Sequence, residues 1–292
     1  MSKRELEVAG ESRRASKAAR VAGGEDGEGE YLYHELFERM QATFPEDMAG
    51  LLAPGTAEAR REELVEMLDL GWIERFAWAV PTKAAIDVVT GLVGLAGASR
   101  VVEIGAGNGY WASLIAARGV EVAAYDVARE DDDDDEGERK VWYKVQGVAS
   151  QDEMMVALEA EDNAVLMLCY PDDGEDADDG EINAESAMSV SALQAFRGEY
   201  VVHVGELMAD GRGVTRPGPW GRTTHPEFQI MLAEHFHQVL ALELPSWPTS
   251  NDVLSVWKRS AEVELDDAEF VYVPAEERLP STRAAPAFAH LL

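Results

Sequence analysis

The residues with the clearest chemical potential lie between Glu103 and Asp126. An apolar run containing Glu103 is followed by three alternating glycines, Gly105, Gly107 and Gly109. Glycine lets the main chain turn sharply and lets a ligand approach a backbone that carries no Cβ. A second apolar run ends at Asp126, about 20 residues further on, where a carboxylate suits hydrogen bonding to the hydroxyls of a ribose. This spacing predicts a nucleoside-type cofactor site.

A βαβ unit would position these groups. Residues 101–104 read as a buried parallel strand, residues 111–118 have the pattern of a helix, and residues 120–125 form a second strand. The carboxyl ends of parallel strands meet at one edge of a sheet, where such folds place their ligands. We therefore expect Glu103, the glycines and Asp126 to share one site at that edge.

The glycine spacing bears on which cofactor is bound. A dinucleotide fingerprint needs G-x-G-x-x-G, whereas this chain has G-x-G-x-G, with Tyr110 at the place of the third dinucleotide glycine. S-adenosylmethionine carries an ammonium and a sulfonium but no phosphate, so the acidic Glu103 before the glycines suits it. Here the chain resembles the class I S-adenosylmethionine-dependent methyltransferases, whose first motif is E/D-x-G-x-G-x-G. NAD binding and a sheet without a ligand are the alternatives.

Further segments look like a poorly characterised family of methyltransferase-like proteins found in microbes. The likeness spans roughly residues 70–259 and supplies no substrate. It implies a Rossmann-like α/β fold: a seven-stranded sheet in the order 3-2-1-4-5-7-6, its last strand antiparallel, with an N-terminal helical extension. The segments that carry it are FAWAVPT (76–82), EIGAGNGYW (103–111), LMLCYP (166–171), VVHVGE (201–206) and LSVWKR (254–259).

The resemblance also implies which residues bind the cofactor. The glycine loop with Glu103 would hold the methionine portion, and Asp126 the ribose hydroxyls. Trp78, Trp111 and Trp247 could wall the cofactor or acceptor pocket, with core packing as the alternative for each. Trp111 is the strongest candidate because it follows the glycines directly. The full set is Glu103, Gly105, Ala106, Gly107, Asn108, Gly109, Tyr110, Trp111, Asp126 and Cys169.

The acceptor side departs from the family pattern. The family usually has Trp-Pro-Pro after the fourth strand, whereas this chain has Tyr170-Pro171-Asp172. Amino-methyltransferases place a D/N-P-P-Y/F motif there, and Cys169 replaces its Asn poorly because a thiol is a weak acceptor. Amino methylation by that mechanism is therefore in doubt. Candidates for a general base or acceptor contact are Glu206, Tyr170 and His225, although Glu206 could equally anchor a loop.

Composition narrows the class of partner. The net charge of −31 indicates against a nucleic-acid substrate, because a polyanion repels phosphate backbones. The same acidity would also suit a salt-adapted surface. An uninterrupted apolar stretch of about 18 residues is lacking, so we expect no membrane span. Cys169 is the only cysteine, which rules out an internal disulfide and fits the cytoplasm. No metal-ligand spacing is found, so we expect no metal site.

We expect four regions along the chain: a charged, disordered tail (1–28), a helical extension (29–98), the cofactor-binding domain (99–260) and a Pro-interrupted tail (261–292). Helices are expected over 31–44, 57–70, 82–95, 152–159, 184–196 and 226–237. A strand is expected over 141–145, solvated acidic loops over 130–138 and 172–179, and a long loop over 208–224. The remaining strands are 164–169, 200–204, 239–244 and 253–257.

These observations together predict a methyltransferase that uses S-adenosylmethionine and acts on an unidentified, small-molecule acceptor. The alternative from another class is a non-catalytic scaffold on which cofactor binding is vestigial. An NAD-dependent oxidoreductase is the third hypothesis.

Overall fold

The computed structural model describes residues 31–51, 53–68, 71–127, 140–159, 163–172, 187–207, 223–265, 268–280 and 283–292. The predicted N-terminal tail and the acidic run at 130–138 lie outside these residues. Most of the acidic loop at 172–179 and of the loop at 208–224 also lies outside them.

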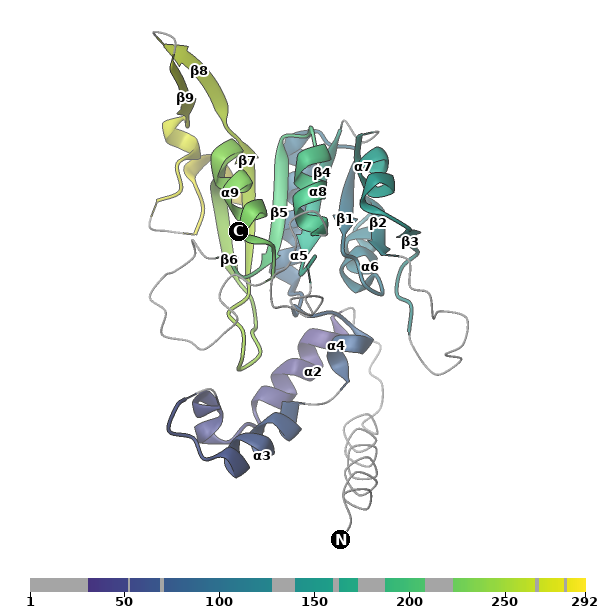
Figure 1. The fold of residues 1–292 in the computed structure, drawn as a ribbon, viewed down its shortest axis with the longest axis vertical. Coiled ribbons are helices and arrows are strands. Elements are labelled where there is room, and N and C mark those ends of the chain that lie inside the picture. Colours follow the sequence, from purple (N-terminus) through teal and green to yellow (C-terminus); the bar gives the residue numbers. More distant parts are fainter. Residues whose placement is uncertain are drawn as a thin grey trace.

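A seven-stranded sheet forms the centre of the molecule (Figure 1). Its order is β3-β2-β1-β4-β5-β7-β6, and β7 alone runs antiparallel to its neighbours. The order and the antiparallel strand expected from the sequence are both confirmed. The strands are β1 (Arg100–Ile104), β2 (Glu121–Val127), β3 (Val145–Val148), β4 (Ala164–Cys169), β5 (Tyr200–Gly205), β6 (Phe236–Glu243) and β7 (Val253–Arg259).

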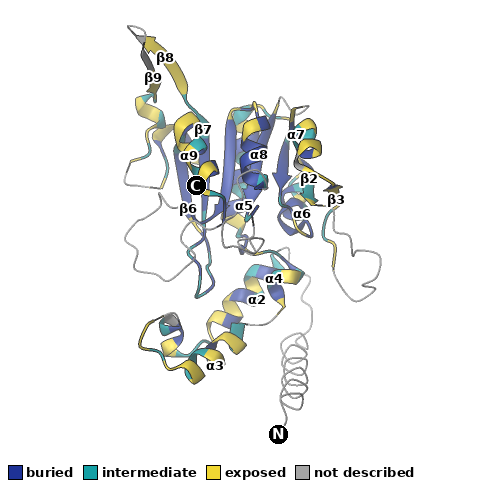
Figure 2. Ribbon diagram, in the orientation of Figure 1, coloured by how far each residue is buried: buried dark blue, intermediate teal, exposed yellow. Residues whose placement is uncertain are grey.

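The central strands are covered on both faces, which is why their sequences are almost continuously apolar. Alternate residues of a strand point to opposite sides, so Val101 packs in one core and Val102 in the other. The first core includes α5 (Lys83–Ala96) and α6 (Tyr110–Ala117). The second includes α7 (Gln151–Glu159), α8 (Met188–Ala195) and α9 (Pro226–His235). Figure 2 shows the strands as the most deeply buried layer.

Helix α5 shows how local signals set the ends of an element. The Thr82 hydroxyl accepts the Ala85 backbone N–H at 3.1 Å and caps the first turn. The helix ends at Gly97, whose φ of 61° is the left-handed conformation common just after a helix. The chain then enters β1, so the glycine loop that follows β1 starts from a rigid base.

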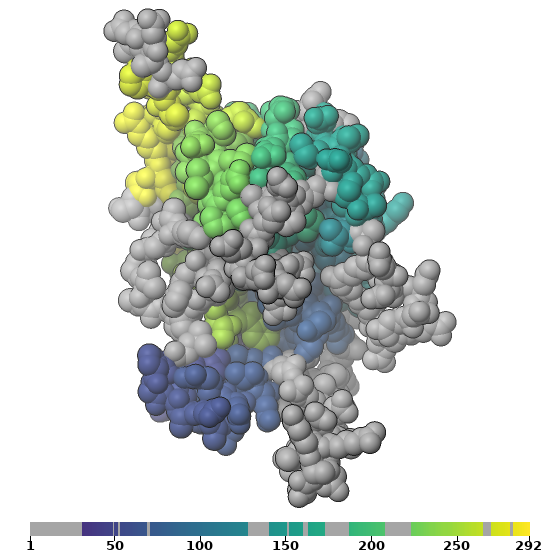
Figure 3. Space-filling model, viewed as in Figure 1, coloured from purple at the N-terminus to yellow at the C-terminus, as the bar shows by residue number. Residues whose placement is uncertain are grey.

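The N-terminal helices lie beside the edge of the sheet where the parallel strands end (Figure 1). They are α2 (Leu32–Gln41), the 3-10 helix η1 (Glu46–Gly50), α3 (Glu58–Leu68) and α4 (Trp72–Arg75). In Figure 3 their purple and blue atoms form a lobe below the green part of the sheet domain. Tyr33, Phe37 and Phe76 join the same apolar core as α5 and α6, so the lobe is packed onto the sheet domain.

Two sequence-based expectations were wrong. The third strand is Val145–Val148 and not 141–145, because Trp142 and Tyr143 pack against the glycine loop before the strand begins. The C-terminal region is also more structured than a tail. It contains a β-hairpin of β8 (Ala261–Leu265) and β9 (Ala268–Tyr272), followed by the 3-10 helices η4 (Ala275–Glu277) and η5 (Pro286–Leu291).

Among the described residues, no helix combines the length and the apolar character needed to cross a membrane.

Candidate active site

The glycine loop adopts a conformation that only glycine tolerates easily. Gly105, Gly107 and Gly109 have φ values of 75°, 59° and 79°. A Cβ on Gly105 would lie 2.8 Å from Pro171 Cα, and one on Gly109 would lie 2.7 Å from Tyr143 Cβ. A Cβ on Gly107 would meet no atom within 4 Å. The outer glycines are therefore required by packing, whereas the middle glycine faces open space.

Asp126 lies directly against the middle glycine. Its Oδ2 accepts the Gly107 N–H at 2.5 Å, and its Oδ1 accepts the Val127 N–H at 2.7 Å. The parallel pairing of β1 with β2 sets this geometry, because the Gly105 N–H also bonds the carbonyl of Tyr125 at 3.0 Å. The structure thus brings together the two features that the spacing placed at one edge.

Glu103 lies buried beneath the loop, with only 1% of the residue exposed. Burial and the nearby charge of Asp126 raise the pKa of its carboxyl to about 8, although the backbone N–H of Ala112 in α6 acts in the opposite direction. Its Oε2 has no hydrogen-bond partner in the described part of the chain. The site therefore contains a buried carboxyl group that lacks a complete set of partners.

Other predicted cofactor residues hold the helical lobe onto the loop. The Asn108 amide donates to the carbonyls of Glu74 and Arg75 at 3.1 and 2.9 Å. The Tyr110 hydroxyl accepts the Tyr33 N–H at 3.2 Å. Both side chains are buried, as is that of Ala106. These contacts attach the N-terminal helical lobe to the glycine loop, so Asn108 and Tyr110 have a structural role.

Trp111 is a core residue. Its side chain is buried, and its Nε1 donates to the carbonyl of Ala79 at 3.2 Å. Trp247 is also buried, and its Nε1 donates to the Tyr33 hydroxyl at 3.2 Å. Neither indole lies at an open surface, so we do not assign a cofactor wall to them. Trp78, in contrast, is 51% exposed.

Tyr170 follows β4 in an unusual conformation. Its φ of 50° makes it the only residue other than glycine with a positive φ in the described chain. Such strain persists only where the surroundings enforce it, and it is often found at functional sites. The Tyr170 hydroxyl donates to Asp252, and its ring stacks on Trp78 with centroids 5.8 Å apart and planes 11° apart. Tyr170 thus joins an exposed indole to a buried acid.

Cys169 precedes Tyr170 at the end of β4 and is buried. Burial raises the pKa of its thiol well above the usual value, and the charges of Glu103 and Asp252 act in the same direction. The thiol therefore stays protonated, which favours packing over nucleophilic chemistry.

Sequence reasoning missed Asp252. This residue is 1% exposed, and its carboxylate accepts hydrogen bonds from Tyr170 and from Ser250 Oγ. Burial and the charge of Glu206 raise its pKa to about 7. Its position just before β7 could have revealed it, because an antiparallel last strand starts at the edge where the parallel strands end.

Glu206 and His225 both lie at this edge, and both form hydrogen bonds that hold neighbouring backbone in place. The buried Glu206 carboxylate accepts the Asn251 N–H, and its backbone bonds Thr223 Oγ1. His225 Nδ1 accepts the Glu227 N–H at 3.1 Å and caps α9. The His225 N–H in turn donates to Asp172, which also binds Ser189 at the start of α8. His225 is thereby the weaker of the two as a base.

Among the described residues, three acids of this edge have no cationic partner. In the part of the chain that the structure describes, Glu103, Asp126 and Asp252 form no ion pair with a Lys, Arg or His side chain. Buried carboxylates normally need such a partner or remain protonated. A ligand that brings positive charge would therefore match this edge.

No family model and no curated protein matches the chain. Solved structures with some likeness include an O-methyltransferase from Bacillus cereus in complex with S-adenosylhomocysteine, 13% identical, with a TM-score of 0.40 over 75% of this chain and 100% of that one. Another is an O-methyltransferase of tomaymycin synthesis from Streptomyces achromogenes in complex with S-adenosylmethionine, 16% identical, with a TM-score of 0.40 over 78% and 97%.

A third is the magnesium protoporphyrin IX methyltransferase of Synechocystis with bound S-adenosylmethionine, 11% identical, with a TM-score of 0.34 over 78% and 97% of the two chains. The three scores are too low to support an assignment, so the fold assignment rests on the strand order of this chain.

Proposed function

We propose that the protein is an S-adenosylmethionine-dependent methyltransferase that acts on a small-molecule acceptor. One observation carries the proposal. The buried Glu103 carboxyl, which has no cationic partner among the residues that the structure describes, lies beneath an open glycine bend whose Gly107 N–H is bonded by Asp126.

The charges of the site favour this cofactor over a dinucleotide. S-adenosylmethionine brings a sulfonium and an ammonium, which would supply the positive charge that Glu103 lacks. A pyrophosphate would need the free N–H groups at the start of α6, but the Glu103 carboxyl already faces the N–H of Ala112 there. A pyrophosphate there would place its negative charge beside a carboxyl that supplies no positive charge and would oppose ionisation of Glu103, so NAD fits poorly.

The glycine loop and Asp126 suit the nucleoside part. Gly107 leaves its backbone accessible, and Asp126 has acceptor oxygens beside it for ribose hydroxyls. When bound, the cofactor supplies an electrophilic methyl group for an in-line displacement. The protein then needs mainly to position the acceptor and exclude water.

The acceptor side is formed by Trp78, Tyr170 and Asp252. The exposed Trp78 indole offers a flat apolar surface, and the Tyr170 hydroxyl lies between that surface and Asp252. A carboxyl with a pKa of about 7 is suited to general-base work at neutral pH. We propose a hydroxyl acceptor, whose proton passes through Tyr170 Oη to Asp252 as the new O–CH₃ bond forms.

Calorimetric titration with S-adenosylmethionine tests the cofactor assignment. We expect binding by the unaltered protein, no binding of NAD, and an affinity loss of about 100-fold in Asp126→Ala, from the loss of charged hydrogen bonds. Glu121→Gln is the matched control, because Glu121 is an exposed acid at the opposite end of the same strand. If neither cofactor binds at low or high salt, the non-catalytic scaffold replaces this proposal.

A further inference from the structure

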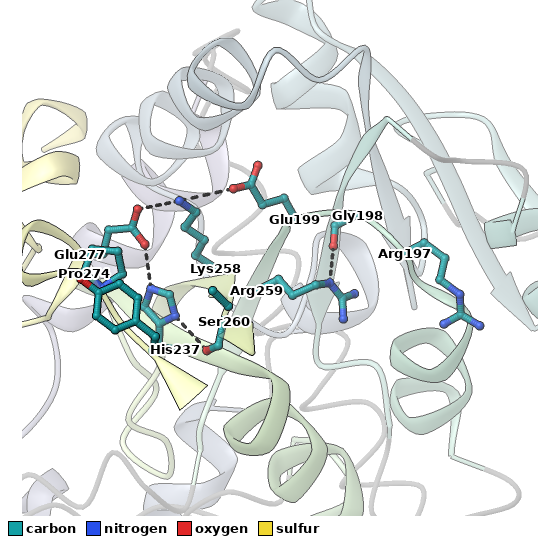
Figure 4. A pocket seen from close by; sticks show the side chains of 11 residues that line it. Arg197, Gly198, Glu199, His237, Lys258, Arg259, Ser260, Pro274 and Glu277 are labelled. Atoms are coloured by element: carbon teal, nitrogen blue, oxygen red, sulfur yellow. Dashed lines mark hydrogen bonds and ion pairs between the residues drawn. The ribbon is translucent and has the colours of Figure 1, made fainter. Parts of the chain in front are cut away.

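A pocket lies at the edge of the sheet opposite the candidate active site, where β5 begins and β7 ends. It has a volume of about 360 Å³ and lies between the sheet and the base of the β8–β9 hairpin. Its chemically active lining residues include His237, Lys258, Ser260 and Glu277 (Figure 4). The volume is within the range of small-molecule sites, roughly 300–1,000 Å³.

His237 connects an acid to a hydroxyl within this pocket. Its Nε2 lies 3.2 Å from Glu277 Oε2, and its Nδ1 lies 3.0 Å from Ser260 Oγ (Figure 4). The three residues come from the start of β6, the turn after β7 and η4. Residues distant in the sequence thus form a continuous Glu–His–Ser chain.

The chemistry of the partners determines the imidazole tautomer. An ionised carboxylate can only accept, so Nε2 must carry the proton that it donates to Glu277. Burial lowers the pKa of His237, so the ring is neutral at pH 7 and Nδ1 keeps its lone pair. Nδ1 must then accept the Ser260 O–H. This is the hydrogen-bonding state of a serine prepared for proton removal.

Lys258 pairs with the same acid. Its ammonium lies 2.6 Å from Glu277 Oε1, so the two oxygens of Glu277 serve Lys258 and His237 separately. The Glu277 and His237 side chains are only 14% and 13% exposed, which protects both contacts from solvent. Arg197 and Arg259 also line the pocket and supply positive charge.

We propose that this pocket is a second catalytic site, in which Ser260 is the nucleophile for acyl transfer from small carboxylic esters. Ser260 Oγ forms a bond to the ester carbonyl carbon while its proton passes to His237 Nδ1. The carbonyl electron pair moves onto oxygen and then returns as the alcohol leaves with the proton from His237. Water then gives a proton to the same nitrogen as its oxygen bonds the acyl carbon. The bond from Ser260 Oγ to that carbon breaks, the carboxylic acid leaves, and Oγ takes the proton back from His237.

The arrangement differs from the familiar serine triad in one respect. There the imidazole presents Nε2 to serine and Nδ1 to the acid, whereas His237 does the reverse. Either imidazole nitrogen can accept and return a proton. The reversed arrangement therefore changes the orientation of the ring towards serine, and the proton transfers stay the same.

A fluorophosphonate probe tests the proposal on the full-length protein. Serine attack forms a P–O bond and expels fluoride, so the adduct reports nucleophilicity without knowledge of the ester. We expect one adduct by intact mass, mapped to Ser260 and absent in Ser260→Ala. In His237→Gln the labelling rate should fall about 100-fold, the usual contribution of a general base. Ser99→Ala, which removes an exposed serine elsewhere, should leave labelling unchanged.

A second variant guards against loss of folding in His237→Gln. In Ser260→Cys the new thiol lies beside His237, while Cys169 is buried. Its alkylation by iodoacetamide should show a thiol pKa below the usual value of about 8.5, and the added His237→Gln change should restore that value. The proposal would be overturned if no adduct formed at Ser260. It would also be overturned if the His237→Gln change altered neither the labelling rate nor the thiol pKa of Ser260→Cys. Cofactor binding does not enter either measurement.

Discussion

Acidic residues have different partners at the two edges of the central sheet: the amino edge, where the parallel strands begin, and the carboxyl edge, where they end. At the amino edge, Glu199 and Glu277 both pair with Lys258, and Glu277 also bonds His237. At the carboxyl edge, Glu103 and Asp252 are buried and form no ion pair within the described segments, and the pKa values of both carboxyls are raised. Burial of an uncompensated charge is costly. The carboxyl edge is therefore incomplete as it stands, and a cationic ligand would complete it.

The largest expected effect concerns the backbone of the carboxyl edge. Gly105→Ala should lower the free energy of unfolding by about 3 kcal/mol, from backbone strain at positive φ and the close approach to Pro171. Gly107→Ala meets no neighbour and should cost only about 1 kcal/mol. Urea denaturation of the two variants measures the difference. Equal losses would contradict the distinction between packed and open glycines.

Glu103→Gln should stabilise the ligand-free protein by about 2 kcal/mol at pH 8, because it removes a buried charge and keeps the shape. The folded-state pKa of about 8 lies above the usual 4.5, so the folded protein binds this proton more tightly than the unfolded chain does. The contribution of the protonated Glu103 carboxyl to the free energy of unfolding is fully present below about pH 4.5. It is lost as the pH rises towards and through 8. Unfolding measured at pH 5 and pH 8 checks this, and a gain that does not grow with pH would refute it.

Glu277→Gln should destabilise the protein, whereas Glu103→Gln should stabilise it. It removes the acid that pairs with Lys258 and bonds His237, so the free energy of unfolding should fall by about 1 kcal/mol at pH 7. The same denaturation series measures it. If Glu277→Gln and Glu103→Gln changed stability in the same direction at pH 8, the contrast between the edges would fail.

The smallest expected effect on stability is that of Trp78→Ala. The half-exposed indole stacks on Tyr170, so its loss should change the unfolding free energy by about 0.5 kcal/mol or less. Affinity for S-adenosylmethionine should stay the same, because we propose Trp78 for the acceptor side. A large loss of cofactor affinity would instead place this indole at the cofactor.

The contacts that could be predicted best from the sequence are those between the ends of neighbouring parallel strands. The apolar runs of β1, β4 and β5 and the meeting of Asp126 with Gly107 could be predicted, because parallel pairing brings successive strand ends together. The Tyr170–Asp252 contact joins positions 82 residues apart and depends on the final antiparallel strand.

Burial was harder to predict than position. Trp111 follows the glycines directly, yet the helix turns its indole into the core and onto the Ala79 carbonyl. Strand β8 of the β8–β9 hairpin has acidic residues, which in the sequence resemble a polar tail. Its pairing with β9 could not be predicted from that local pattern.

The pH dependence of S-adenosylmethionine binding tests the central claim most directly, because that claim is that Glu103 meets the cationic cofactor. Between pH 6 and 7.5 the affinity should rise by up to about 10-fold per pH unit, and calorimetry in two buffers should record release of close to one proton at pH 7. In Glu103→Gln both effects should disappear. Binding that is independent of pH and releases no proton in the unaltered protein would contradict the account.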